Sequence, residues 1–185
     1  MANNSIYLIT NNKGKWASAE RVFQKYGFDI KQLKEDFYEI QADTSLEIAK
    51  HTALTVAKER NLTVIREDHS LIIEGLGIPG PYTKFIEKQI SPEKLLEILS
   101  ALNITKGYFI LSAVLARPDG SYKEYSYNVD IKFSSLPKGD SNQRWDRVLM
   151  FPNEERTFAE FESGTGVWDK NFEAICKDII DSNKK

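Results

Sequence analysis

The chain has 185 residues, 41% of them hydrophobic and 28% charged, and a formal net charge of −2. This length fits one large domain or two closely packed lobes, and the apolar residues are sufficient for a core. The near-neutral charge, without a basic block, argues against a nucleic acid as partner, and no apolar run approaches the ~20 residues of a membrane span. The single cysteine, Cys176, cannot form an internal disulfide, which favours a reducing cytoplasm.

The first predicted elements are a strand over residues 5–10 and a helix that ends near Gly27. The helix follows from apolar residues at steps of three and four: Trp16, Ala19, Val22, Phe23 and Tyr26. Between them, the turn from Asn11 to Lys15 brings two lysines to a helix N-terminus, which is an arrangement that attracts anions. The alternative is a simple N-cap, in which Asn11 or Asn12 satisfies the first turn of the helix.

A short strand over residues 29–33 and a second helix come next. The loop after this strand carries three acidic residues: Glu35, Asp36 and Glu39. Thr44 to Glu47 fits the capping-box pattern, and the apolar stripe behind it predicts a helix that ends at Arg60.

The segment from Arg66 to Phe85 combines acidic residues with a glycine-rich turn. Glu67 and Asp68 follow a β-branched run, so we expect them at the end of a buried strand, where they can hold a hard divalent ion. Residues 75–81 contain three glycines and two prolines, and such a turn lets backbone amides approach a phosphate. The same turn matches the G-x-G-x-x-G string of dinucleotide-binding folds, but its prolines oppose the helix that this motif requires. A plain structural turn is the other alternative.

The second half predicts short helices, a long hairpin and a final helix. The helices cover residues 84–89 and a segment that begins at Ser91-Pro92. Two strand-like runs, 107–117 and 121–133, are joined by a Pro-Asp-Gly turn, which predicts an antiparallel hairpin. The final helix spans about residues 170–180, and we expect residues 181–185 to fray.

Several short motifs resemble those of one enzyme family. They are, in chain order, T-x-N-x-x-K at Thr10–Lys15, the acidic segment Glu67–Leu71, G-x-P-G-x-Y at Gly77–Tyr82, Trp145-Asp146, Thr157–Glu160 and Lys170-Asn171. This order and content are similar to the inosine triphosphate pyrophosphatase family, whose members hydrolyse deaminated purine nucleoside triphosphates to the monophosphate and pyrophosphate. The matches cover nearly the whole chain, which makes the resemblance far more specific than any single motif.

The resemblance implies a fold, a cofactor and partners. The fold would be α/β, with a long twisted mixed sheet flanked by helices and two lobes around a central cleft, formed by residues 1–185 as one domain. The expected protein is a cytoplasmic homodimer that acts on a nucleoside triphosphate with Mg²⁺ as cofactor and binds neither nucleic acid nor membrane.

The resemblance also implies roles for individual residues. Glu39, Glu67 and Asp68 would ligate Mg²⁺, Asp68 would orient or deprotonate the attacking water, and Lys15 would act with it in catalysis. The residues expected to bind substrate are Thr10, Asn12, Lys13, Lys15, Gly77, Gly80, Lys84, Arg144, Trp145, Asp146 and Lys170. For Trp145, stacking near the base and packing in the core are both open.

The chain also departs from the family pattern. Ala174-Ile175-Cys176 stands where relatives have a Ser-His-Arg motif that helps to read the base, and Arg144 and Arg147 replace a glycine and a proline. We expect one of these two arginines to donate to O6 of the base. If this segment is an extended strand, Arg144 shares a face with Asp146 and is the better candidate. The departures leave two alternatives open: a nucleotide-binding homologue with lost or low turnover, and a pyrophosphatase of the same fold with altered base preference.

Overall fold

The computed structural model describes residues 5–141, 144–161, 166–182 and 184. The chain divides into two compact units, each built from separate segments of sequence. The first unit comprises Met1–Asp68, Leu111–Tyr127 and Gly166–Lys185, and the second comprises His69–Ile110 and Asn128–Thr165. Within the described residues, no helix is both long and apolar enough to cross a membrane.

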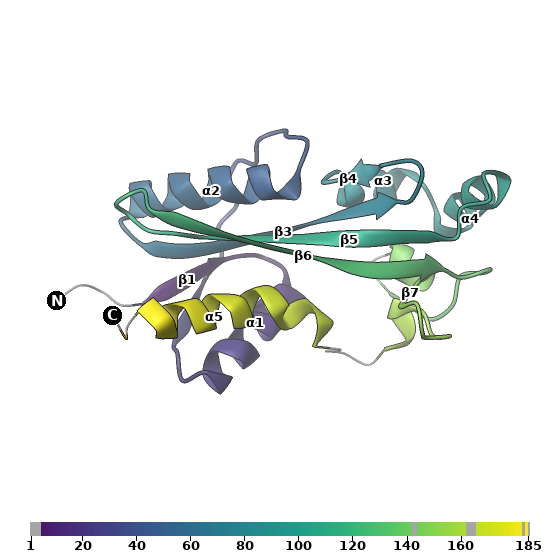
Figure 1. Ribbon diagram of the computed structural model, residues 1–185. Coiled ribbons are helices and arrows are strands. Elements are labelled where there is room, and N and C mark those ends of the chain that lie inside the picture. Colours follow the sequence, from purple (N-terminus) through teal and green to yellow (C-terminus); the bar gives the residue numbers. More distant parts are fainter. Residues whose placement is uncertain (1–4, 142–143, 162–165, 183, 185) are drawn as a thin grey trace. The chain divides into compact units, whose positions relative to one another are not determined.

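The strands form one mixed sheet (Figure 1). They are β1 (Ile6–Ile9), β2 (Ile30–Leu33), β3 (Thr63–Ile73), β4 (Pro79–Gly80), β5 (Lys106–Ala116), β6 (Tyr122–Phe133) and β7 (Leu149–Met150). Their order is β2-β1-β3-β5-β6-β7, with β4 paired to β3. β1 lies parallel to both β2 and β3, whereas β4 and β7 are antiparallel to their neighbours. The predicted mixed α/β fold is confirmed, and the central cleft stays a prediction.

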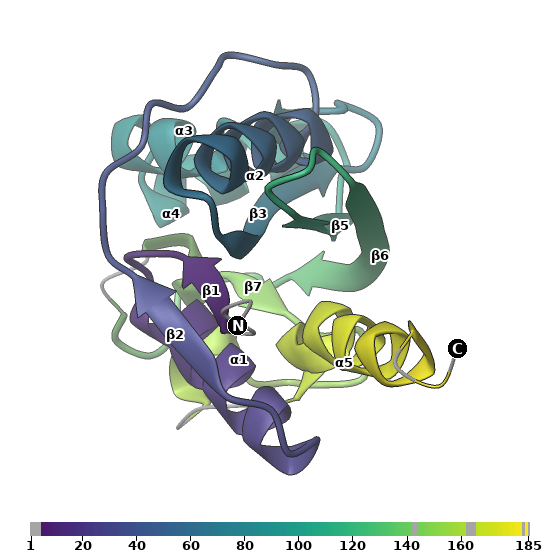
Figure 2. The ribbon, with the colours of Figure 1, turned by 90° about the vertical axis from the view of Figure 1, so that its left-hand side faces the viewer.

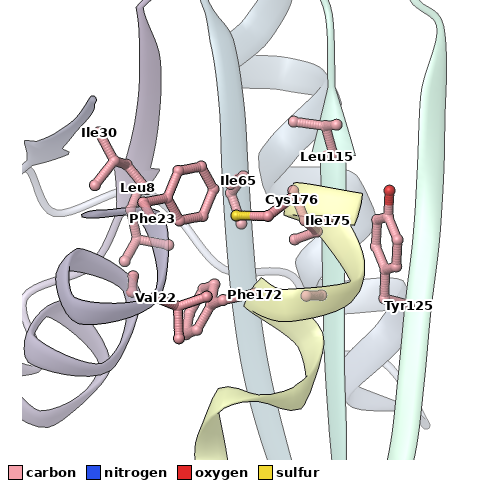
Figure 3. Close-up of a cluster of buried hydrophobic side chains, with 12 residues drawn as sticks. Leu8, Val22, Phe23, Ile30, Ile65, Leu115, Tyr125, Phe172, Ile175 and Cys176 are labelled. Carbon is pink, nitrogen blue, oxygen red and sulfur yellow. The ribbon is translucent and has the colours of Figure 1, made fainter. Parts of the chain in front are cut away.

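In the first unit, helices cover both faces of the sheet (Figures 1 and 2). Helix α2 (Ser45–Arg60) lies on one face, and α1 (Lys13–Lys25) and α5 (Lys170–Ser182) lie on the other. Neighbouring strand residues alternate between the two layers: Leu8 packs in the cluster of α1 and α5, and Ile9 in the cluster of α2 (Figure 3 shows the first cluster). Because side chains on a strand alternate with a period of two, both faces of these strands are apolar and buried.

Two predicted helix starts are confirmed by their caps. Asn12 is the N-cap of α1, and its side-chain oxygen accepts from the backbone N–H groups of Gly14 and Lys15. Thr44 caps α2 in a complete capping box with Glu47. Each cap satisfies backbone donors that have no partner within their own helix.

The second unit is built around one apolar cluster. Its helices are α3 (Thr83–Gln89), α4 (Pro92–Ala101), and the single turns η1 (Arg144–Arg147) and η2 (Phe158–Glu160), while η3 (Val167–Asp169) belongs to the first unit. The buried members of the cluster are Leu71, Ile73, Leu95, Leu99, Ile131, Trp145, Val148 and Leu149. They come from β3, α4, β6, η1 and β7, so this unit has a core of its own.

Two sequence predictions are wrong in detail. β3 continues to Ile73, so Glu67 and Asp68 lie in the middle of a strand. The pairing with β1 ends at Arg66, but β3 also pairs with β5 and, at Leu71 and Ile72, with β4. Residues 144–147 form a 3₁₀ turn, so the strand geometry assumed for Arg144 does not hold.

The frayed tail over residues 181–185 stays a prediction. Helix α5 extends to Ser182, and residues 183 and 185 lie outside the described part.

The close approach of β5 to β3 yields the first prediction. A Cβ atom added at Gly107 would lie 2.6 Å from the carbonyl oxygen of Ile72, well inside contact distance. We expect Gly107→Ala to lower the free energy of unfolding by about 1–3 kcal/mol, because neither backbone can yield without disturbing the sheet. Chemical denaturation measures this, with Ser126→Ala on the exposed side of β6 as a control that changes stability by less than about 0.5 kcal/mol. Equal stability of the two variants would contradict the steric argument.

Candidate functional site

The topology of the first unit singles out the carboxyl end of β1. The three strands β2, β1 and β3 are parallel, with β1 in the centre: the chain first places β2 on one side of β1 and then β3 on the other. The helices that connect them, α1 and α2, lie on opposite faces of the sheet. In open α/β sheets, such a reversal of strand order leaves a crevice at the carboxyl ends of the strands, where ligands bind. The turn Asn11–Lys15 follows β1 directly, and Glu67 and Asp68 follow Arg66, which is the last β3 residue paired with β1. Lys13, Lys15, Glu67 and Asp68 therefore share one region of the first unit.

Glu67 is the centre of this region. Its exposed fraction is only 2%, which is unusual for a carboxylate. The Lys15 ammonium donates to the backbone carbonyl of Glu67 at 2.9 Å, and the Asn171 side-chain amide donates to Glu67 Oε1 at 3.2 Å. We refer to Lys15, Glu67, Asp68 and Asn171 as the Glu67 cluster. The Glu67 cluster joins α1, β3 and α5. The sequence motifs assign no role to Asn171.

The charge of Lys15 is set by two opposing effects. Burial lowers the pKa of Lys15 below its ordinary value, while the Glu67 and Asp68 carboxylates act in the opposite direction. The structure thus places Lys15 among carboxylates and against the backbone of β3. An ammonium has three N–H donors, so the contact with Glu67 leaves others for a substrate oxygen.

The turn after β1 is stabilised by hydrogen bonds between its own polar groups. Asn12 Oδ1 accepts from Gly14 N at 2.8 Å and from Lys15 N at 3.1 Å, and Thr10 Oγ1 accepts from Asn12 N at 3.1 Å. The N-cap alternative is therefore confirmed, and these two amides are not available to an anion while the cap is intact. Lys13 is exposed at the start of α1. The substrate contacts expected of Thr10, Asn12 and Lys13 stay predictions.

Glu39 is engaged with an arginine. Its carboxylate forms an ion pair with Arg66, which also donates to the Ile9 carbonyl oxygen at 3.1 Å. Among the described residues, no three acidic, histidine or cysteine side chains come together as a metal site. The structure therefore does not assemble Glu39, Glu67 and Asp68 as a three-carboxylate set. Glu67 and Asp68 fit Mg²⁺ by the chemistry of their side chains, because the ion is commonly bound through one or two carboxylates, with waters and substrate phosphates as the other ligands.

In the second unit, Trp145 is a core residue. Its exposed fraction is 2%, its backbone N–H donates to Glu87 Oε1 at 2.7 Å, and its indole N–H donates to the Ile90 carbonyl oxygen at 2.9 Å. The structure therefore favours the core alternative over base stacking. No signal in the sequence marked Glu87, because its partner is 58 residues away.

Asp146 lies beside this carboxylate. Burial, together with the negative charge of Glu87, raises the pKa of Asp146 to about 6, against a weaker opposing effect of the Ser141 hydroxyl. The Ser141 hydroxyl donates to Asp146 Oδ2 at 3.3 Å. An aspartate with this pKa is ionised at neutral pH and becomes protonated in mild acid.

The two arginines that flank the Trp-Asp pair differ in what the structure describes. The Arg144 side chain lies outside the described part, so its role stays a prediction. Arg147 is held by protein groups: its Nε donates to the Gly139 carbonyl oxygen at 3.3 Å, and its Nη1 lies 3.7 Å from Glu93. Arg147 is therefore the weaker candidate for contact with a base.

The glycine-rich turn is tied to β3. Gly77 and Gly80 have φ angles of +70° and +63°, which residues other than glycine rarely adopt. Thr83 Oγ1 donates to the Gly80 carbonyl oxygen at 2.7 Å and accepts from Leu71 N at 3.0 Å. α3 begins at Thr83, after the G-x-G-x-x-G string, so the turn lacks the helix of a dinucleotide site. Lys84 is exposed in the first turn of α3. Phosphate contacts of Gly77, Gly80 and Lys84 stay predictions.

Helix α5 explains the most prominent departure from the family pattern. Ile175 and Cys176 have no exposed surface and pack in the cluster between α1, α5 and the sheet (Figure 3). α5 therefore presents buried apolar residues where the family resemblance leads us to expect histidine and arginine. Lys170, at the start of α5, is exposed, and its ammonium lies 5.1 Å from the ring centroid of Tyr127.

The strand order around β1 defines an open α/β protein, a class in which ligands commonly bind at the carboxyl ends of parallel strands. The chain belongs to the Ham1 family, whose model matches residues 6–165. This confirms the family resemblance predicted from the motifs. The matched range ends before α5, the helix that lacks the Ser-His-Arg motif.

Individual relatives agree with this assignment. The chain is 32% identical over 153 residues to the dITP/XTP pyrophosphatase of Thermococcus kodakarensis, with 82% of both chains covered. It is 30% identical over 156 residues to the dITP/XTP pyrophosphatase of Methanopyrus kandleri, with 84% of this chain and 83% of the relative covered. The solved structure of a HAM1 protein from Coxiella burnetii has a TM-score of 0.78 at 19% identity, over 94% of this chain and 98% of that one, so it shares the fold.

The raised pKa of Asp146 yields a prediction for stability. Since burial and Glu87 raise this pKa from 3.8 to about 6, the folded state binds the proton more tightly than the unfolded state, and the ionisation of Asp146 lowers stability as pH rises from about 4 to 6. Asp146→Asn avoids that ionisation. We expect the free energy of unfolding of the variant to exceed that of the wild type by up to about 3 kcal/mol at pH 7.5, and by little at pH 4.

Thermal unfolding at both pH values measures this difference. Asp29→Asn, which changes an exposed carboxylate, is the control and should match the wild type at both. A difference between Asp146→Asn and the wild type that does not change with pH would show that Asp146 titrates normally.

Proposed function

We propose that the protein is a nucleoside triphosphate pyrophosphatase that hydrolyses inosine and xanthosine (deoxy)triphosphates to the monophosphate and pyrophosphate, and so removes deaminated purines from the nucleotide pool. Membership of the Ham1 family and relatives named dITP/XTP pyrophosphatase support this proposal. The structural observation that carries it is the Glu67 cluster, in which the Lys15 ammonium contacts the backbone carbonyl of the buried Glu67 and lies within electrostatic range of the Glu67 and Asp68 carboxylates.

In this proposal Glu67 and Asp68 hold Mg²⁺. When bound, the ion neutralises the charge of the phosphates and orients them. Asp68, which is more exposed than Glu67, positions the attacking water and accepts its proton. Glu39 joins the acidic set only if its ion pair with Arg66 opens.

Lysines supply the remaining positive charge for the triphosphate. Lys15 acts from within the Glu67 cluster, while Lys13, Lys84 and Lys170 are exposed and contribute positive charge near the phosphates. Phosphoryl chemistry of this kind depends mainly on positioning and charge neutralisation, so no covalent intermediate is required.

Base selection is assigned to Asp146 and Arg144. Hypoxanthine and xanthine present an N1–H donor and an O6 acceptor, whereas adenine presents an N1 acceptor and an amino group. An ionised Asp146 accepts from N1–H and disfavours the adenine N1, and Arg144 donates to O6.

A second candidate function is a pyrophosphatase of the same fold with altered base preference. The observation that favours it is the burial of Ile175 and Cys176, which removes the family's base-reading side chains from α5. Both candidates share the chemistry at Glu67 and Asp68 and differ only in the substrates that they prefer.

We also propose that the protein is a cytoplasmic homodimer. The resemblance to the pyrophosphatase family supports the dimer, and the buried, unpaired Cys176 fits a reducing compartment. Size-exclusion chromatography with light scattering tests the oligomeric state.

The catalytic proposal predicts that Asp68→Asn lowers turnover by at least ~10²-fold, because it removes the charge that orients water and metal while keeping the size of the side chain. Pyrophosphate release measures turnover, and removal of divalent ions with a chelator should abolish it until Mg²⁺ is added back. Asp130→Asn, an exposed carboxylate on β6, is the matched control and should retain full activity. Near-normal turnover of Asp68→Asn would remove Asp68 from the mechanism.

The base-reading proposal predicts that the wild type prefers inosine and xanthosine triphosphates to adenosine triphosphate at pH 7.5. This preference should decline as pH falls through about 6, because Asp146 then becomes protonated and can donate to the adenine N1. Loss of one buried polar match costs ~1–3 kcal/mol, so Arg144→Ala should weaken the preference by about 5- to 150-fold.

The control for Arg144→Ala is Arg147→Ala, since Arg147 is already engaged with Gly139 and Glu93. Full preference in both variants would exclude arginine from base selection. A wild type that does not discriminate among bases would favour the second candidate function.

A further inference from the structure

Asn171 is a buried polar residue at the start of α5, with an exposed fraction of 2%. Its side-chain amide nitrogen has two N–H donors and contacts two acceptors, Glu67 Oε1 and the backbone carbonyl oxygen of Leu111, each at 3.2 Å. The Leu111 carbonyl belongs to β5 and cannot move independently of the sheet. Asn171 is therefore fixed by one donor and restrains Glu67 with the other.

Glu67 is thus held at two points. Lys15 binds its backbone carbonyl from α1, and Asn171 binds its carboxylate from α5. The Lys15 contact holds the backbone, and the Asn171 contact restricts the rotamers of a side chain that would otherwise have three rotatable bonds. Such restriction is what preorganises a ligand for a metal ion.

The chemical nature of the contact is equally important. A lysine or arginine in place of Asn171 would neutralise the carboxylate and compete with a cation. An amide is uncharged, so it orients Glu67 and leaves its negative charge in place. A carboxylate has about four acceptor sites, and the hydrogen bond from the Asn171 amide occupies one of them.

We propose that Asn171 is a positioning residue that orients the Glu67 carboxylate to bind a divalent cation. This inference rests on the proposed function, in which Glu67 is a ligand of Mg²⁺. Asn171 contacts the protein and acts only through Glu67.

The rival explanation is that Asn171 merely joins α5 to β5 and β3. A structural role predicts a loss of stability without a change in metal affinity. A positioning role predicts weaker metal binding that requires the Glu67 carboxylate.

The test measures Mn²⁺ binding to the substrate-free protein by electron paramagnetic resonance, since Mn²⁺ suits the same oxygen ligands as Mg²⁺. Asn171→Leu keeps the approximate size and removes both donors. We expect its Kd for Mn²⁺ to rise ~10- to 100-fold, as for other residues that orient a metal ligand.

The matched control is Ser112→Ala. Ser112 follows Leu111 on β5, is buried, and its hydroxyl contacts the Ser45 hydroxyl at 3.1 Å. This variant removes a buried polar contact from the same strand without touching Glu67, and its Kd for Mn²⁺ should match that of the wild type. Circular dichroism establishes that each variant is folded, and Asn171→Ala, which adds no bulk, serves if Asn171→Leu does not fold.

A double-mutant cycle shows whether Asn171 acts through Glu67. In a Glu67→Gln background, the Asn171 substitution should have no further effect on Mn²⁺ binding. An unchanged Kd in the single variants, an equal shift with and without the Glu67 carboxylate, or a wild type that does not bind Mn²⁺ would each overturn the inference.

Pyrophosphate release by the wild type is measured separately. A wild type that binds Mn²⁺ through Glu67 and Asn171 but hydrolyses no triphosphate would refute the proposed function and leave the positioning role standing. An active wild type whose Mn²⁺ affinity does not depend on Asn171 would refute the positioning role alone.

Discussion

The burial of one carboxylate, Glu67, constrains the rest of the first unit. Removing an ionised group from water is strongly unfavourable unless charges and hydrogen bonds replace the lost hydration. Asn171 donates a hydrogen bond to the carboxylate and Lys15 lies near it with a positive charge, and these two residues come from helices at opposite ends of the chain. β1 must therefore pair with β3 in the observed register, and α1 and α5 must pack on the same face of the sheet. The apolar cluster of Figure 3 holds these elements in that arrangement.

Each unit contains a pair of neighbouring ionisable groups, and the two pairs have opposite electrostatics. In the first unit, the Glu67 and Asp68 carboxylates attract the Lys15 ammonium, which opposes the larger effect of burial in lowering the pKa of Lys15. In the second unit, Asp146 lies near Glu87, and the like charge adds to burial in disfavouring ionisation. Attraction suits a site that must stay charged to bind metal and phosphate, whereas repulsion leaves a carboxyl sensitive to mild acid.

Local sequence patterns predicted most helices and strands of this fold correctly. Contacts between residues far apart in the sequence could not be predicted in this way. The capping residues Asn12 and Thr44 marked their helices correctly because a cap depends on three or four neighbouring residues. The end of β3 was misplaced because polar residues within a strand resemble a strand end when the pairing partners are unknown. Asn171 contacts Glu67 across 104 residues, so no local pattern could reveal its role. The motifs identified Glu67 and Asp68, but only the structure shows what holds Glu67 in place.

The apolar packing of α5 also limits how the site can be changed by substitution. Ile175 and Cys176 lie in the core with no exposed surface. Histidine and arginine at these positions would bury cationic groups among apolar side chains, at a cost of several kcal/mol against a total stability of about 5–15 kcal/mol for an ordinary domain. Such substitutions would therefore disrupt the fold before they supplied a base-reading group. Segments other than α5 can accept cationic side chains at a lower cost.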